Sequence, residues 1–259
     1  MFKEMFILQN KLNDFTNGKN WILNITEKGK IINWERAIVL EIAELIESMP
    51  WKHWKSINQE PDFLNIRIEL VDIWHFLMST IISSYKICES KKINNNIYKY
   101  SNREILDNIN YDYIENLFNK KFTNIYIPKK WNLKEHQNIN EYINVFDRLM
   151  MKTLELQEYK KTKNVPYILE RIEEIIIFFI EACQTYELSK EELYKLYIGK
   201  NVLNQFRQDN GYKEGTYKKI WNGEEDNVLM TNVINETNLD DLSFDYLYLE
   251  LNSIYTNIE

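Results

Sequence analysis

Glycine and proline are scarce in this sequence, which has six glycines and four prolines in 259 residues. Both residues interrupt regular structure, so their scarcity favours long helices joined by few turns. Long apolar runs are also missing, since the longest, from Ile175 to Ile180, stops at Glu181. A membrane-spanning helix needs roughly 20 apolar residues, and the apolar stretch at the N-terminus is too short for the core of a signal peptide. We therefore expect no membrane segment.

Cysteine and net positive charge are the other two shortages. The two cysteines, Cys88 and Cys183, have neither metal-binding nor redox spacing, so a reducing cytoplasm is the expected location. The chain carries 32 Lys and Arg against 39 Asp and Glu, a net charge of −7. This balance argues against nucleic acid as a partner, and any contact with a nucleotide should depend on a local basic cluster.

Helical periodicity dominates what is present. Apolar residues make up 44% of the chain, and no segment alternates convincingly with period two, which predicts an all-α helical bundle. Asn33 is placed to cap one helix, and Ser189 with Glu192 forms a capping box that starts another. The polar segment 90–135 is interpreted as an insertion, partly helical near 104–118. The main helices are predicted at 2–13, 34–49, 61–89, 141–161, 167–187 and 190–207, followed by two short ones.

Four acidic residues form two pairs with the same spacing. Glu41 and Glu44 lie three residues apart, as do Glu69 and Asp72, so each pair projects from one face of a helix. Their neighbours are apolar, so we expect all four carboxylates on the buried side, where they repel one another unless cations neutralise them. Oxygen ligands suit magnesium, and two such pairs could hold two ions roughly 3.5–4 Å apart. The pattern predicts a magnesium site for phosphate chemistry.

A solvated helix face and a di-iron centre are the competing interpretations of the acids. An isolated pair of this spacing is usually solvated, and Glu170 with Glu173 is an example in this chain. A di-iron carboxylate bundle needs a Glu-x-x-His pair on each of two helices, whereas only His75 follows an acid, Asp72, at that spacing. Two pairs on consecutive helices of matching layout, flanked by tryptophans, favour the magnesium interpretation.

A basic cluster lies far from the acids in sequence. Lys200, Asn204 and Arg207 are spaced i, i+4, i+7 and share one helical face. They lead into a loop, 210–219, that contains glycines, aromatic residues and lysines. Alone, such a face is usually solvated. Together with magnesium ligands, however, cations and a closing loop are typical of phosphoryl transfer.

These motifs carry a resemblance to a known family. Four blocks resemble the dimeric, all-α dUTPases of the all-α nucleoside triphosphate pyrophosphatase superfamily, with epsilon-group bacterial members the most similar. The resemblance implies one all-α domain over 1–259, with a variable insertion and connecting helices at about 86–165 and a phosphate-binding helix and closing loop at 190–227. The blocks are LQNKLNDFTNGKNW (8–21), NWERAIVLEIAELIESMPWKHWK (33–55), NIRIELVDIWHF (65–76) and LYIGKNVLNQFRQDNGYKEGTYKKIWNGEEDN (196–227).

The resemblance also implies an activity and roles for particular residues. The reaction would be magnesium-dependent hydrolysis of dUTP, and of dUDP, to dUMP in a homodimer with shared active sites and two or more ions per site. Glu41, Glu44, Glu69 and Asp72 would be the metal ligands, and Glu44, rather than Glu41, would orient or deprotonate the attacking water. The residues implied in substrate binding are Gln9 and Asn13, which would read uracil; Trp54, His75 and Phe76, which would pack against base and sugar; and Lys200, Asn204, Arg207, Tyr212, Lys213, Lys219 and Asn227, which would bind phosphate or close the site.

Two different functions also fit this sequence. One is that of a housecleaning pyrophosphatase on the same fold that accepts a broader range of nucleotides. The other is that of a non-catalytic regulatory protein that binds dUTP without hydrolysing it. The presence of all four acids and of the basic cluster favours an enzyme.

Overall fold

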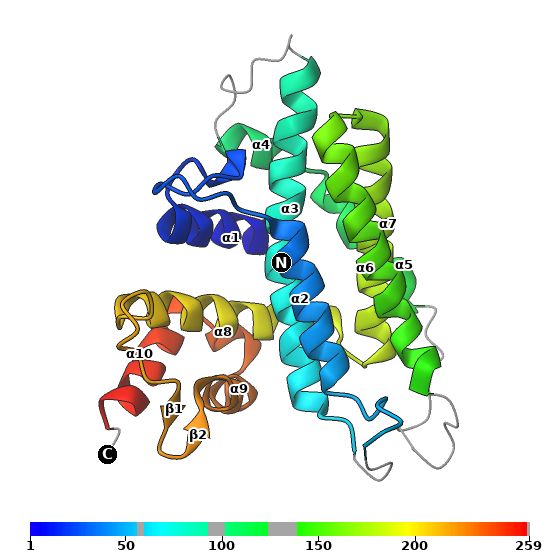
Figure 1. The fold of residues 1–259 in the computed structure, drawn as a ribbon. Helices are drawn as coiled ribbons and strands as arrows, with labels where there is room; N and C mark the ends of the chain where they lie inside the picture. The colour runs from blue at the N-terminus through cyan, green and yellow to red at the C-terminus, as the bar shows by residue number, and fades with distance from the viewer. Residues whose placement is uncertain (56–59, 93–101, 124–138, 258–259) are drawn as a thin grey trace.

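The computed structural model describes residues 1–55, 60–92, 102–123 and 139–257 (Figure 1). In these segments ten α-helices account for nearly all regular structure, which confirms the predicted all-α fold. The strands are limited to one hairpin of two-residue strands, β1 (Ile220–Trp221) and β2 (Glu224–Glu225). No helix in the described part of the chain is long and apolar enough to cross a membrane.

Long helices that lie side by side form the larger part of the molecule (Figure 1). They pack around a core in which Trp74 stacks on Phe179, with ring centroids 5.0 Å apart. Two shorter helices, α4 (Asn102–Asn108) and α5 (Tyr111–Thr123), fall inside the segment predicted as a partly helical insertion. The long helices are α2 (Trp34–Glu47), α3 (Phe63–Lys92), α6 (Ile139–Thr162) and α7 (Val165–Thr185).

The N-terminal helix and the C-terminal region approach α3 together (Figure 1). They comprise α1 (Phe2–Asn17), a 3-10 turn (Trp21–Leu23), α8 (Lys190–Asp209), the hairpin, α9 (Asp226–Glu236), a second 3-10 turn (Leu239–Asp241) and α10 (Phe244–Thr256). Helices α8 and α9 cross closely at Gly199, where an added Cβ would lie only 2.0 Å from the Ile234 side chain. Because of this close crossing, the polar side chains of Asp226 and Asn227 on α9 lie against the face of α8 that carries Lys200 and Arg207.

The predicted helix ends are largely confirmed. The Asn33 side chain accepts a hydrogen bond from the Arg36 amide at 2.8 Å, and Ser189 forms the capping box with Glu192. Helix α1 extends four residues beyond its predicted end at 13, and Gly18, with φ of 83°, terminates it. Asp14 remains helical in part because its carboxylate accepts a hydrogen bond from the Trp21 indole at 2.9 Å.

Candidate active site

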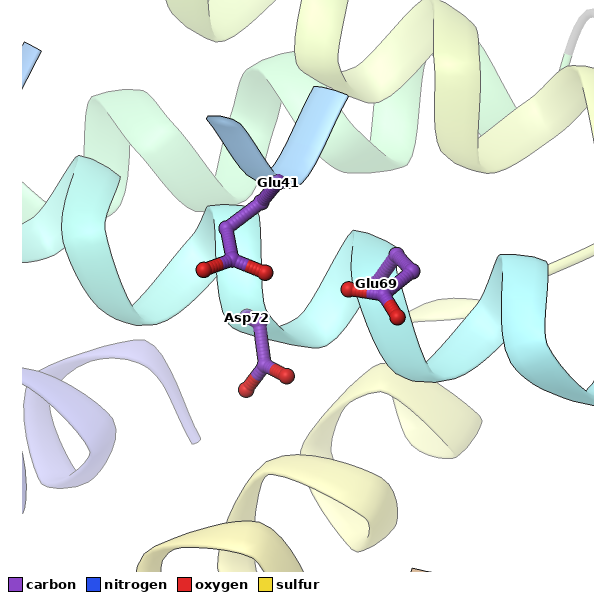
Figure 2. Close-up of side chains that lie close together, drawn as sticks. All are labelled: Glu41, Glu69 and Asp72. Carbon is purple, nitrogen blue, oxygen red and sulfur yellow. The ribbon is translucent and has the colours of Figure 1, made fainter. Parts of the chain in front are cut away.

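Three carboxylates from two helices converge between α2 and α3 (Figure 2). Glu41 points from α2 toward α3, where Glu69 and Asp72 lie one turn apart. Each residue contributes an oxygen, and these three oxygens all lie within 4.8 Å of one another. Carboxylate oxygens at such separations suit a hard divalent cation such as magnesium. The donor set therefore fits the metal that the sequence predicted.

The electrostatics of this cluster are those of crowded acids. Burial raises the pKa of Glu41 well above its ordinary value, and the charge of Asp72 and a hydrogen bond to Glu69 raise it further. The pKa of Glu69 is also raised, chiefly by burial. A hydrogen bond links the two carboxyl groups, and burial favours a proton on this pair. A divalent cation would take the place of this proton.

Glu44 corrects one expectation from the sequence, because its side chain is exposed rather than buried. It lies outside the group of oxygens formed by the other three acids, although its charge is close enough to raise the pKa of both Glu41 and Glu69. Three residues along a helix correspond to about 300° of rotation. Glu44 is therefore turned by about 60° from Glu41, toward the solvent edge of the acidic face.

Lys200 reaches the carboxylates from α8. Its Nζ lies 2.8 Å from Asp72 Oδ2, and only 5% of the lysine side chain is exposed. The same ammonium donates a hydrogen bond to Asn227 Oδ1 at 2.8 Å. A solvated basic face, the ordinary interpretation of this pattern, is thus wrong for Lys200. The only acidic cluster of this kind in the described residues has a buried cation beside it.

Arg207, seven residues farther along α8, has a different environment. Its Nε and Nη2 donate to the two carboxylate oxygens of Asp226, at 2.9 and 2.7 Å. The Tyr217 hydroxyl donates to the same carboxylate at 2.7 Å. Asp226 is 1% exposed, so this two-pronged ion pair is buried and fastens the start of α9 to α8. Arg207 is therefore a brace as well as a nearby positive charge.

The other predicted phosphate-binding residues surround this brace. Asn204 Oδ1 accepts a 3.5 Å contact from Arg207, and Asn227 is shared between Lys200 and Arg207. In the exposed loop after α8, Tyr212 lies between cations, with Arg207 Cζ 5.9 Å and Lys219 Nζ 5.7 Å from its ring centroid. Lys213 ties the loop to α1 through a 2.7 Å hydrogen bond to the Thr16 carbonyl.

The predicted uracil-reading residues form a buried polar cluster one turn along α3 from Asp72. His75 Nδ1 lies 2.6 Å from Gln9 Oε1, and Gln9 Nε2 donates to Asn13 Oδ1 at 3.1 Å. Burial, followed by the nearby charge of Lys200, lowers the pKa of His75 to about 3, so the imidazole is neutral. Gln9, Asn13 and His75 are thus brought together as expected, beside the carboxylates.

Two predicted aromatic residues lie elsewhere. Phe76 packs against Trp34 of α2, with ring centroids 6.0 Å apart. Trp54 is 61% exposed and contacts Trp51 and His53 in the loop after α2. Within the described residues, the ring contacts of Phe76 and Trp54 do not include the imidazole of His75.

Three residues that contact the predicted site residues were given no role in the sequence analysis. Ser79 follows His75 by four residues, Tyr197 precedes Lys200 by three, and Asp226 directly precedes Asn227. Helical spacing from a predicted site residue could have indicated the first two. Nothing local indicates that Asp226 pairs with Arg207, since the two lie 19 residues apart.

This combination of groups suits a nucleotide. The carboxylates could bind a cation, the buried lysine beside them could bind phosphate, and the amide-rich cluster could bind a base. A family model described as dUTPase matches residues 1–212. The chain belongs to the dUTPase family. Its activity is accordingly the hydrolysis of dUTP, that of a dUTP diphosphatase. No curated protein matches the chain. The matched region of this dUTPase contains the acids, Lys200 and Arg207, but ends before Asp226 and Asn227.

Proposed function

We propose that this dUTPase hydrolyses dUTP, and also dUDP, to dUMP with two or more magnesium ions held by Glu41, Glu69, Asp72 and Glu44. The observation that carries the proposal is the convergence of three carboxylates within 4.8 Å beside Lys200. Glu44 joins them through its position at the solvent edge of the same helix face. A substrate that brings additional oxygens would complete such an open site, since magnesium is usually held by few carboxylates together with substrate phosphates.

The protein groups divide the chemical work between them. Bound magnesium supplies charge neutralisation and a more acidic water. Glu41 would hold the metal as a deprotonated carboxylate, together with oxygens of Glu69 and Asp72 from the neighbouring helix. Glu44 is exposed where solvent can approach, which suits a residue that orients or deprotonates the attacking water.

The phosphate groups would lie between α3 and α8. Lys200 can exchange its contact with Asp72 for a phosphate oxygen without leaving the site, because charge-assisted contacts of both kinds have similar lengths. Asn204 and Asn227 flank it, and the loop that carries Tyr212, Lys213 and Lys219 would close over the far end of the triphosphate. Arg207 adds positive charge while it keeps Asp226 in place.

The base would lie toward the cluster of Gln9, Asn13 and His75, one helical turn beyond Asp72. The metal ligands and the base-binding cluster would then follow one another along α3, with the phosphate-binding cations on α8 beside them. A closely fitting wall would exclude the 5-methyl group of thymine and a ribose 2′-hydroxyl, and Phe76 and Trp54 are assigned to that wall on resemblance alone. We also propose a cytoplasmic homodimer in which each subunit helps to complete the site of its partner.

A panel of nucleotides tests the function directly. Purified protein with magnesium should release pyrophosphate from dUTP at least 100-fold faster than from dTTP, dCTP or UTP. Similar rates on all four would instead indicate a housecleaning pyrophosphatase of broad specificity. Tight calorimetric binding of dUTP without any phosphate product would indicate a regulator. Light scattering after gel filtration tests the dimer, since a monomeric mass at working concentration would contradict it.

A further inference from the structure

Helix α10 packs against α8, beside the loop 210–219 that is proposed to close over phosphate (Figure 1). Its apolar side is well anchored, because Leu247 and Leu251 are each only 1% exposed. The helix lies beyond the region that the dUTPase family model matches. Its last turn nevertheless contacts the loop, which links α10 to the phosphate-binding part of the site.

Tyr217 anchors the second half of this loop. Every residue from 212 to 219 is exposed except Tyr217, which is half-buried. A segment with so few buried contacts has little packing of its own to keep its shape. The Tyr217 hydroxyl donates to Asp226 Oδ2 at 2.7 Å, and its ring stacks on Tyr255 of α10, with centroids 5.5 Å and planes 13° apart. The position of the loop therefore depends on what holds Tyr217.

Tyr255 rests on the rigid part of the molecule. Besides Tyr217, its ring lies against Phe206 of α8 and Trp221 of β1, with centroids 5.3 and 5.1 Å away. Phe206 and Trp221 are fully buried, so they give the Tyr255 ring a firm support. Its hydroxyl also accepts a long hydrogen bond from the Lys218 amide, at 3.5 Å. One aromatic ring thus joins the exposed loop to the packed core of this region.

The contacts continue from Tyr217 to the cations of the loop. The Tyr212 ring meets Tyr217 edge-on, with centroids 6.0 Å apart and planes at 62°. Arg207 and Lys219 lie over the Tyr212 ring, where the electron-rich face of an aromatic ring attracts positive charge. A shift of Tyr217 would therefore move Tyr212 and with it the nearby ammonium of Lys219. Tyr255 stands at the start of this series of contacts.

We propose that Tyr255 is a positioning residue that holds the loop 210–219 in the arrangement that binds the phosphates of dUTP. The inference rests on the proposed function, in which this loop closes over the far end of the triphosphate. Tyr255 acts through Tyr217 and not through the substrate. Without its ring, the binding arrangement would be populated for a smaller fraction of the time, and the apparent affinity falls by that fraction. Saturating dUTP restores the arrangement, so KM should rise while kcat is kept.

The test is Tyr255→Leu, with Tyr248→Leu as the matched control on the same helix. The Tyr248 hydroxyl donates to Asp209 Oδ2 at 3.0 Å and its ring packs on Phe206, with centroids 5.3 Å apart, so this tyrosine supports α10 on α8 and not the loop. We expect Tyr255→Leu to raise KM for dUTP about tenfold and to change kcat by less than about threefold. Tyr248→Leu should leave KM within about twofold of the parent value, and Tyr255→Phe, which keeps the ring, should do the same.

Two product inhibitors separate positioning of the loop from general loosening of the fold. The phosphate of dUMP does not reach the far end of the triphosphate site, so the inhibition constant of dUMP should change by less than about twofold in Tyr255→Leu. That of inorganic pyrophosphate with magnesium should rise about tenfold, because pyrophosphate occupies the part of the site under the loop. An unchanged KM for dUTP in Tyr255→Leu, an equal loss of dUMP binding, or an equal rise of KM in Tyr248→Leu would overturn the proposal.

Cleavage by trypsin reports on the loop without any substrate. Lys213, Lys218 and Lys219 are exposed, and proteolysis of a segment that opens locally follows the population of its open form. Trypsin should therefore cut Tyr255→Leu at these lysines about tenfold faster than the parent enzyme, and Tyr248→Leu at about the parent rate. If Tyr255→Leu does not fold, Tyr255→Met is read in the same way, because the flexible thioether fills the space without a ring to stack.

The trypsin experiment keeps this inference distinct from the proposed function. A parent enzyme that is inactive on dUTP would refute the proposed function, whatever the rate of cleavage. A parent enzyme that is active on dUTP, with a Tyr255→Leu variant that is cut no faster and binds pyrophosphate equally well, would refute this inference alone.

Discussion

The ion pair between Lys200 and Asp72 provides the sharpest test of the site, through Lys200→Met. Methionine keeps the length and apolar stem of the side chain but removes the ammonium that lies 2.8 Å from Asp72 Oδ2. Three crowded acids would then lack their buried counter-charge. Removal of one partner from a buried ion pair costs about 3–5 kcal/mol, and because Asp72 is 19% exposed we expect the lower end, about 3 kcal/mol. For a chain of this size that corresponds to a fall in Tm of roughly 6–12 °C.

Magnesium should reverse much of this loss. If the acids bind divalent cations, saturating magnesium supplies the missing positive charge, and its stabilisation should be larger in Lys200→Met than in the parent enzyme. Urea unfolding with and without magnesium measures both quantities. Turnover of dUTP should fall about 100-fold or more, because a charge directed at the phosphates is lost.

Lys190→Met is the matched control. Lys190 lies on the same helix and pairs with Glu115 at 3.0 Å, but the two side chains are 24% and 40% exposed. Surface pairs of this kind contribute about 0–1 kcal/mol. Equal destabilisation by the two substitutions, or equal stabilisation of both variants by magnesium, would refute the view of Lys200 as a buried counter-charge of a metal site.

Three further substitutions test other parts of the site. Glu44→Gln should leave unfolding within about 0.5 kcal/mol because the side chain is exposed and lower turnover about 100-fold or more, whereas Glu47→Gln, one turn farther along, should leave turnover near the parent value. Glu41→Gln should weaken a pH dependence. The raised pKa of Glu41 means that the folded chain keeps a proton the unfolded chain has released, so without metal the unfolding free energy of the parent falls as pH rises above the ordinary pKa of glutamate. Glu69, whose pKa is also raised, should keep part of this slope, and a variant with the full slope of the parent would contradict the prediction. Asp226→Asn should cost about 3 kcal/mol in urea unfolding because it breaks a buried pair, against little change for the exposed Asp209→Asn, and equal effects would argue against the brace.

The helices could be predicted from the sequence because the signals that define them are local. Periodicity placed the long helices, and the Asn33 cap and the capping box at Ser189 lie within one turn of the ends that they fix. The end of α1 was missed because Asp14 reads as a loop residue, whereas its contact with Trp21 keeps it helical. The hairpin was missed because strands of two residues carry no alternation to detect.

The four acids show what residue spacing can and cannot predict about the site. Spacing of three residues correctly indicated that Glu69 and Asp72 share a face, but it could not tell that α8 would cover this pair while Glu44 stayed at the solvent edge. Burial of one carboxylate and exposure of another, at identical spacing, depend on which helix packs above them. That information lies in the tertiary arrangement and not in either helix.

The environments of Lys200 and Arg207 also depend on tertiary packing and not on their spacing in the sequence. From the sequence they are equivalent, two positive charges on one face of one helix, and both were expected to bind phosphate. The structure separates them through α9, which crosses α8 at Gly199. Arg207 is bound by both oxygens of Asp226, whereas Lys200 donates to the neutral amide of Asn227 on α9 and directs its charge at Asp72. A cation already held by both oxygens of a buried carboxylate has little attraction left for phosphate, so we propose that Lys200 is the residue that contacts phosphate and that Arg207 holds α9, whose Asn227 accepts a hydrogen bond from Lys200.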